Sequence, residues 1–109
     1  MTLADVIRQI DQLHDGLSIY AAPRWRAESP AVAAREPRDG GQPDGADGMT
    51  YLISVRLARR AIAARAAWRP EQELGLQDRC KAVIYYAVYD APEPRPLPAN
   101  VEVALPIAI

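Results

Sequence analysis

Residues of the types that catalyse reactions are scarce in this chain, and each has a structural explanation. His14 is the only histidine and stands at the end of a predicted helix, where the helix dipole stabilises a cationic imidazole. Cys80, the only cysteine, falls on the apolar face of another predicted helix, which is typical of an inert core thiol. No serine has a nucleophile-elbow context, and no glycine-rich phosphate loop follows a strand. The sequence therefore predicts no catalytic residues and no cofactor, and it favours a protein that is not an enzyme.

A glycine-rich acidic loop is predicted at residues 36–48 (EPRDGGQPDGADG). Asp39, Asp44 and Asp47 are spaced five and three residues apart. Calcium sites of the helix-loop-helix kind instead place oxygen ligands at alternating positions and end in a bidentate glutamate. We therefore expect no metal there. The segment is interpreted as a long solvated loop, and binding of a protein partner is the functional alternative.

The segment that follows this loop carries five arginines and no carboxylate: Arg56, Arg59, Arg60, Arg65 and Arg69. The first three cluster at a predicted strand–helix junction, and the last two form an i,i+4 pair. A nucleic-acid surface would interleave such a patch with aromatic or small polar residues, but the neighbours here are mostly alanine and the chain has a net charge of −1. The pattern favours a solvated helix face. An acidic protein partner and nucleic acid are the alternatives, and nucleic acid is the less favoured of the two.

Two tyrosines lie on the outer face of the last predicted helix. Tyr85 and Tyr89 are four residues apart and fall opposite the apolar face that contains Cys80 and Val83. A pair of outward-facing aromatic side chains needs a cover. Three groups could bury these side chains: the Pro-rich tail of the same chain, a second copy in a homodimer, or a different protein. The last two follow from the enrichment of tyrosine at protein interfaces.

The order of the predicted elements indicates an α+β fold. We expect a helix at 2–14, followed by strands at 17–21, 31–35 and 49–57, of which the strand at 31–35 is weak. A short helix follows, with Leu57, Ala61, Ala64 and Trp68 on one face. The last helix begins at Pro70 or near Leu76 and ends at Asp90. One N-terminal and two C-terminal helices would pack on one face of a small, mainly antiparallel sheet, in the order α-β-β-β-α-α. We predict that the strand at 49–57 is the core strand and that Trp68 packs between helix and sheet.

The N-terminal helix has the clearest end signals. Thr2 and Asp5 occupy the two positions of a capping box. Gly16 is the expected left-handed stop after the last turn.

Length and composition are those of one small domain. At 109 residues the chain can bury roughly two-thirds of its unfolded surface. Residues 1–91 are predicted to form a single α+β domain and residues 92–109 a Pro-rich extended tail, with an alternating edge strand at 100–109 that Pro106 interrupts. The absence of a signal peptide, the absence of a membrane span and the lone cysteine favour a cytoplasmic location and no membrane partner.

Several short motifs are spread between residues 2 and 91. They are Leu3-Ala4-Asp5-Val6 with Ile10 and Leu13, Ile19-Tyr20-Ala21, Trp25, Ser29-Pro30-Ala31-Val32-Ala33, Gly48-Met49-Thr50-Tyr51-Leu52, Trp68, Cys80, Ile84-Tyr85-Tyr86-Ala87 and Asp90-Ala91. As a pattern they resemble a small family of uncharacterised bacterial proteins of about this length. The family has no established activity, so the resemblance implies no catalytic residues. In general appearance the chain is also similar to small immunity proteins.

The leading hypothesis is a non-enzymatic, protein-binding small domain, immunity-like or regulatory, that binds a protein partner or a second copy of itself. The residues expected to contact the partner are Tyr85, Tyr89, Arg56, Arg59, Arg60, Asp39, Asp44 and Asp47. The first alternative is a nucleic-acid-associated regulator that uses the segment from Arg56 to Arg69. The second is a small-ligand binder or enzyme with a pocket near Trp25 and the acidic loop.

Overall fold

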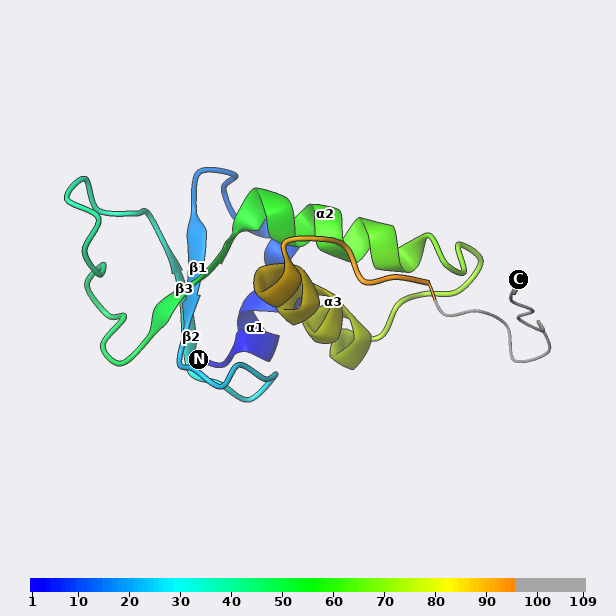
Figure 1. Ribbon diagram of the computed structural model, residues 1–109, viewed down its shortest axis with the longest axis horizontal. Coiled ribbons are helices and arrows are strands. Elements are labelled where there is room, and N and C mark those ends of the chain that lie inside the picture. The colour runs from blue at the N-terminus through cyan, green and yellow to red at the C-terminus, as the bar shows by residue number, and fades with distance from the viewer. Residues whose placement is uncertain (96–109) are drawn as a thin grey trace, which may run out of the picture.

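The computed structural model describes residues 1–95, and it confirms the predicted α+β architecture (Figure 1). The elements, in order, are α1 (Leu3–Arg8), the 3-10 turn η1 (Ile10–Gln12), β1 (Ser18–Ala21), β2 (Ala31–Ala34), β3 (Thr50–Ser54), α2 (Val55–Ala66) and α3 (Leu76–Tyr89). The order α-β-β-β-α-α is the one expected from the sequence. The predicted tail strand at 100–109 lies outside the described residues.

Helix α1 begins at the predicted capping box. The Thr2 hydroxyl accepts a hydrogen bond from the Asp5 amide (3.2 Å), and the Asp5 carboxylate accepts one from the Thr2 amide (2.9 Å). These hydrogen bonds to Thr2 lower the pKa of the Asp5 carboxyl. The predicted extent of 2–14 is too long, because the α-helix ends at Arg8 and the chain tightens into η1.

The turn after η1 also differs from the expectation. Gly16 does not adopt the left-handed conformation, and its amide donates a hydrogen bond to Nδ1 of His14 (2.9 Å). A left-handed stop is not needed at this point, because the α-helix has already ended several residues earlier. His14 therefore lies in a turn, and the argument that a helix dipole acts on its imidazole does not apply.

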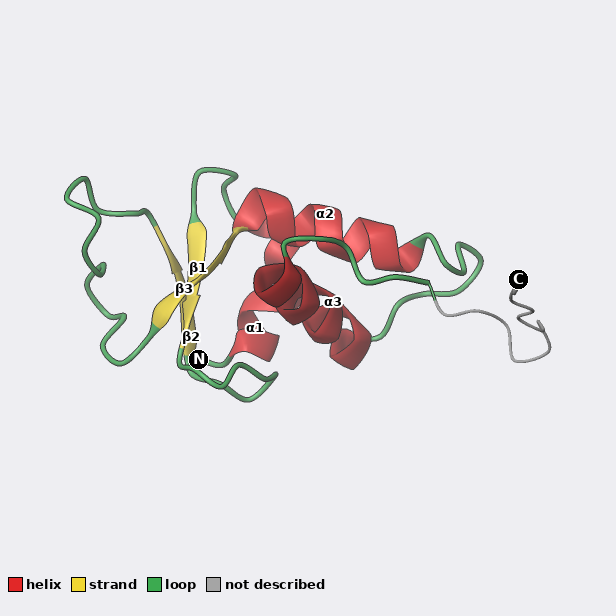
Figure 2. Ribbon diagram, viewed as in Figure 1, coloured by secondary structure: helices red, strands yellow, loops and turns green. Residues whose placement is uncertain are grey.

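The sheet has the strand order β2-β1-β3, and both strand pairs are antiparallel. Strand β1 is central, and all four of its residues are buried. The helices lie on one side of the sheet and the long loop between β2 and β3 lies on the other (Figure 2). The prediction that the strand at 49–57 is the core strand is therefore wrong, since β3 is an edge strand.

Strand β3 is also shorter than predicted because Ser54 starts a helix. The Ser54 hydroxyl accepts a hydrogen bond from the Leu57 amide (3.1 Å), which is a helix N-cap. Val55 and Leu57 continue the apolar alternation of the strand by sequence, yet both belong to α2. Val55 is fully buried there, because the first turn of α2 faces the core.

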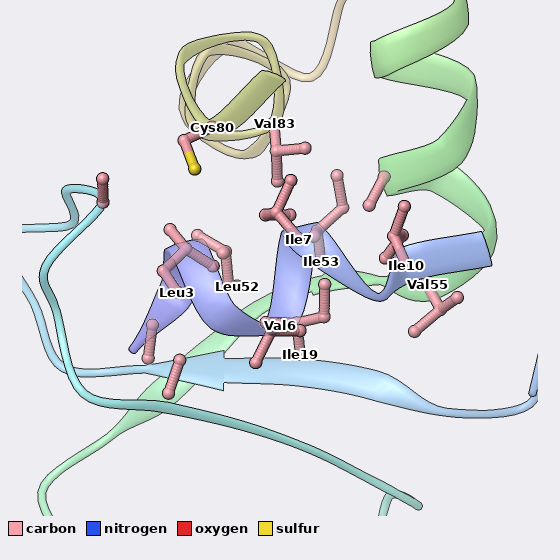
Figure 3. Close-up of a cluster of buried hydrophobic side chains, with 14 residues drawn as sticks. Leu3, Val6, Ile7, Ile10, Ile19, Leu52, Ile53, Val55, Cys80 and Val83 are labelled. Atoms are coloured by element: carbon pink, nitrogen blue, oxygen red, sulfur yellow. The ribbon is translucent and has the colours of Figure 1, made fainter. Parts of the chain in front are cut away.

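Helix α1 lies at the centre of the hydrophobic core, between the sheet and α3 (Figure 3). Its four core side chains are almost completely buried: Leu3, Val6, Ile7 and Ile10. In Figure 3, Ile7 points toward Val83 of α3, whereas Val6 points toward Ile19 of β1. The short N-terminal helix therefore connects the two layers of the domain.

Helices α2 and α3 pack on each other through small side chains. Ala58 and Ala61 on α2 and Ala82 on α3 are buried. Small residues at such a contact let two helix axes approach closely. In the described part of the chain, no helix has the length and apolar character needed to cross a membrane.

Helix α3 begins at Leu76, with Gly75 as its N-cap. Of the two predicted starts, Pro70 and Leu76, the second is therefore correct. Its predicted inner face is confirmed, because Cys80 and Val83 are buried and the remaining members pack against the core. The helix ends at Tyr89, and Asp90 takes a left-handed conformation with φ of 55°.

The prediction that Trp68 packs between helix and sheet is wrong. Helix α2 ends at Ala66, so Trp68 lies in the following turn, where it is partly buried and does not join the core. The Arg65 guanidinium lies 3.9 Å from the centroid of its ring. The early end of the helix has a sequence cause, because Pro70 disfavours helical backbone at the residue before it.

Replacing Trp68 by alanine is expected to lower the free energy of unfolding by only about 1–2 kcal/mol, the scale of one cation–π contact with modest burial. A tryptophan inside the core would cost about 3–5 kcal/mol. Urea denaturation followed by circular dichroism separates the two values. A loss above about 3 kcal/mol would contradict the position described here.

Candidate functional site

An open groove runs along α3, between this helix and the turn that follows β1, and its volume is about 390 Å³. It is lined by Trp25, Arg26 and Ala27 from the turn and by Gln77, Cys80, Lys81, Ile84, Tyr85, Val88 and Tyr89 from the helix. We call this feature the α3 groove. Its lining is mostly apolar or aromatic, which suits the burial of another molecule's surface.

Tyr85 and Tyr89 form a tilted aromatic pair in the lining of the groove. Their ring centroids are 4.4 Å apart, and the ring planes meet at 39°. Lys81, Tyr85 and Tyr89 form one line along α3, because residues four apart lie above one another on a helix. Tyr89 is 63% exposed, and the neighbouring Val88 is 55% exposed. The C-terminal half of the groove therefore presents apolar surface to solvent.

The opposite wall of the groove is held in place by hydrogen bonds. The Trp25 indole N–H donates to the Ala21 carbonyl of β1 (3.2 Å). The Leu3 amide at the start of α1 donates to the Ser29 carbonyl of the same turn (2.8 Å). Trp25 also packs against the hydrophobic core. The turn is thus attached to both the sheet and α1, and the groove is formed before any partner arrives.

The groove contains no pair of groups suited to acid–base or nucleophilic chemistry. Cys80 is 2% exposed, and burial raises the pKa of its thiol, so the thiol stays protonated at neutral pH. The polar side chains in the lining are Arg26, Gln77 and Lys81, together with the Tyr hydroxyls. No carboxylate or imidazole lines the groove among residues 1–95.

Arg59, one of the residues expected to contact a partner, is engaged within its own chain. Its Nε and Nη2 donate to the Ile10 carbonyl at 3.1 and 2.9 Å. Nη2 also donates to the Leu13 carbonyl, and Nη1 pairs with the Asp15 carboxylate. The Leu13 carbonyl lies just after η1, where backbone acceptors lack a helical partner, whereas the Ile10 carbonyl also accepts the Leu13 amide (3.3 Å). We call this set of contacts the Arg59 clasp.

Arg65 is also used inside the chain. Besides its contact with Trp68, its guanidinium lies 3.5 Å from the Asp78 carboxylate of α3. Arg56 and Arg60 are exposed on α2. Two of the five arginines in this segment are therefore occupied by intrachain contacts, which reduces the set that could face an acidic protein or nucleic acid.

After α3 the chain turns back and passes α2 and α3, as the orange segment in Figure 1 shows. The Glu93 carboxylate is 3.6 Å from Nζ of Lys81 and 3.9 Å from Nε of Arg65, and it is 9% exposed. Residues 91–95 do not line the α3 groove. The part of the tail expected to cover Tyr85 and Tyr89 beyond that point lies outside the described residues.

The acidic loop is exposed along most of its length but has one buried residue. Asp39, Asp44 and Asp47 are exposed, and the Asp39 carboxylate accepts the Gly41 amide (2.9 Å). Ala46 in the same loop is fully buried, so the loop is not solvated along its whole length. Within residues 1–95, the structure brings together no three histidine, cysteine or carboxylate groups as a metal site.

Tyr20 and Tyr51 lie next to this loop and make an edge-to-face contact with centroids 5.8 Å apart. A cavity of about 510 Å³ separates them from the loop side chains, among them Arg38 and Met49. Burial raises the pKa of the Tyr20 hydroxyl. The cavity shares no lining residue with the α3 groove, so Trp25 and the acidic loop do not form the single pocket that the sequence suggested.

The sequence pattern predicts only one wall of the groove. Tyr85 and Tyr89 were recognised by their spacing, but Trp25 stands in an irregular segment whose position in space has no periodic signal. Val88 is the one signal in the sequence that points to the groove, because it is an apolar residue of α3 that does not belong to the inner face.

Comparison with known proteins finds no matching family model, no similar curated protein and no similar solved structure.

Proposed function

We propose that this chain is a non-enzymatic protein-binding domain, regulatory or immunity-like, and that it binds its partner in the α3 groove. The observation that carries the proposal is the tilted Tyr85–Tyr89 pair, which stands partly exposed along a preformed, mostly apolar groove. Tyrosine supplies a large, rigid contact area and a hydroxyl for hydrogen bonding, and it is enriched at the centres of protein interfaces.

Three features support a binding role over a catalytic one. The groove lining offers no acid–base pair, the Cys80 thiol is buried, and the wall that carries Trp25 is fixed by hydrogen bonds. A preformed wall lowers the ordering cost of association, because fewer side chains lose freedom on binding. A lone buried thiol needs no oxidising compartment, so the proposal includes a cytoplasmic location.

Site-specific photocrosslinking tests this function. A benzoylphenylalanine is placed at Tyr89 in the groove, and a matched control carries it at Arg60, an exposed residue of α2 outside the groove. After irradiation of cells that naturally contain the protein, we expect one defined protein adduct from the Tyr89 position that is missing from the Arg60 position. The proposal fails if the groove position gives no adduct, or if both positions give the same set.

A further inference from the structure

We infer that the occupant of the α3 groove is an amphipathic segment of another protein that carries carboxylates beside its apolar side chains. This inference rests on the proposed function and adds the chemistry of the partner. It follows from the charges that line the groove, from its length, and from the result of placing two copies of the groove face to face.

The charges in the groove lining have one sign. Arg26 on the turn and Lys81 on α3 are both exposed, and no carboxylate lies in the lining within the described part of the chain. Lys81 also pairs with the Glu93 carboxylate outside the lining (3.6 Å), so Arg26 is the lining cation for which the described residues show no carboxylate within 4 Å. The whole chain has a net charge of −1, so this positive character is local to the groove. Complementary charge across an interface selects among partners and speeds association. A partner with acidic side chains matches this lining, and a basic one is repelled.

Along α3, the charged lining residue precedes the large exposed apolar ones. Lys81 stands toward the N-terminal half of α3, and Tyr85, Val88 and Tyr89 stand toward its C-terminal half. A matching partner therefore sets a carboxylate beside Lys81 and its large apolar side chains beside the tyrosines.

The length of the groove fits a short helix. The lining on α3 extends from Gln77 to Tyr89, which corresponds to about 18 Å along the helix axis at about 1.5 Å per residue. A partner helix of roughly 12 residues spans this distance and presents about three apolar side chains at i, i+3 or i+4 spacing. Docking of an amphipathic helix in an apolar groove is a common mode of peptide recognition.

A second copy of the same chain is a poorer match. A symmetric dimer places the same surface patch of each copy against the other. Here that arrangement brings Arg26 and Lys81 of both copies to one interface, and like charges brought together at an interface are destabilising.

Selection from a random peptide library displayed on phage tests the inference on the full chain. We expect the peptides selected by the wild-type protein to combine aspartate or glutamate with leucine, isoleucine or aromatic residues. The affinity of the strongest selected peptide is then measured by fluorescence anisotropy against the Arg26→Glu, Lys81→Glu double variant. It should fall by about tenfold, and the loss should shrink as salt is added.

Two further variants make the result specific. The Arg56→Glu, Arg60→Glu double variant carries the same change in net charge outside the groove, and it should bind the peptide within about twofold of wild type. Arg26→Glu alone leaves the contact between Lys81 and Glu93 intact, and it should still weaken binding if the groove charges act. Thermal melting of each variant confirms that the fold is retained.

The outcomes separate this inference from the function on which it rests. If the selected peptides have no acidic bias, or bind the Arg26→Glu variants as tightly as wild type, while Tyr89→Asp abolishes binding, the groove binds a partner but not an acidic one. If Tyr89→Asp has no effect, or no peptide is selected, the groove is not the binding site and both proposals fall. Concentration-dependent dimers in sedimentation that Tyr89→Asp dissociates would make a second copy the occupant and overturn the inference.

Discussion

Replacing Ile7 by alanine is expected to lower the free energy of unfolding by about 2–5 kcal/mol, the range for deleting a large aliphatic side chain from a packed core. Ile7 is fully buried and points from α1 toward Val83 of α3. The effect is large for this protein because small domains have a total stability of about 5–15 kcal/mol. Nine of the fourteen buried residues in the core cluster are Leu, Ile or Val, so Ile7 is packed among other large aliphatic side chains and its removal leaves a cavity.

Ile62→Ala is the matched control for this substitution. It removes the same atoms from an α2 side chain that is only partly buried, and it should cost less than half as much. Urea titrations of both variants measure the difference. Equal losses for Ile7→Ala and Ile62→Ala would show that α1 is not the centre of the core.

Replacing Arg59 by alanine should lower the free energy of unfolding by about 2–3 kcal/mol, the scale of hydrogen bonds made by a charged group. The substitution removes the guanidinium donors to the carbonyls of Ile10 and Leu13. The Ile10 carbonyl still accepts the Leu13 amide, so the loss is that of the charge-assisted hydrogen bonds. The contact with Asp15 adds little to this value, because that carboxylate is 67% exposed. Urea denaturation again provides the measurement.

Two controls locate this effect in the Arg59 clasp. Arg60→Ala removes the neighbouring exposed arginine and should change the stability by less than about 0.5 kcal/mol. Arg59→Lys keeps the charge but loses the forked donors, so it should recover only part of the loss. Equal stabilities for Arg59→Ala and Arg60→Ala would refute the clasp.

The sequence was sufficient for the fold class because the relevant signals are local. The capping box of Thr2 and Asp5, the alternation before Ala21 and the inner face of α3 each depend on residues within a few positions of one another. The order of strands in the sheet is a different kind of property. The alternation within a strand reports that one face is buried, but it contains no information on which strand has two neighbours. The central position predicted for β3 is therefore occupied by β1.

The candidate site likewise has a part that local sequence signals predict and a part that they do not. The tyrosine pair was recognised because both residues lie on one helix, whereas the wall with Trp25 comes from a segment more than fifty residues away in the chain. The role of Arg59 was equally hidden, because its backbone acceptor at Ile10 is 49 residues away. A carbonyl group is present at every residue, so no sequence pattern marks the one that an arginine binds.

The position of α1 has a consequence for how this protein emerges from the ribosome. Helix α1 is made before the sheet and α3, yet the side chains that enclose it include Val83, which is made near the end of the described chain. At roughly 5–20 residues per second, α1 waits for several seconds with its apolar face uncovered. A nascent chain arrested before α3 would expose that face to chaperones and proteases, so premature termination should yield degraded fragments and no stable shorter domain.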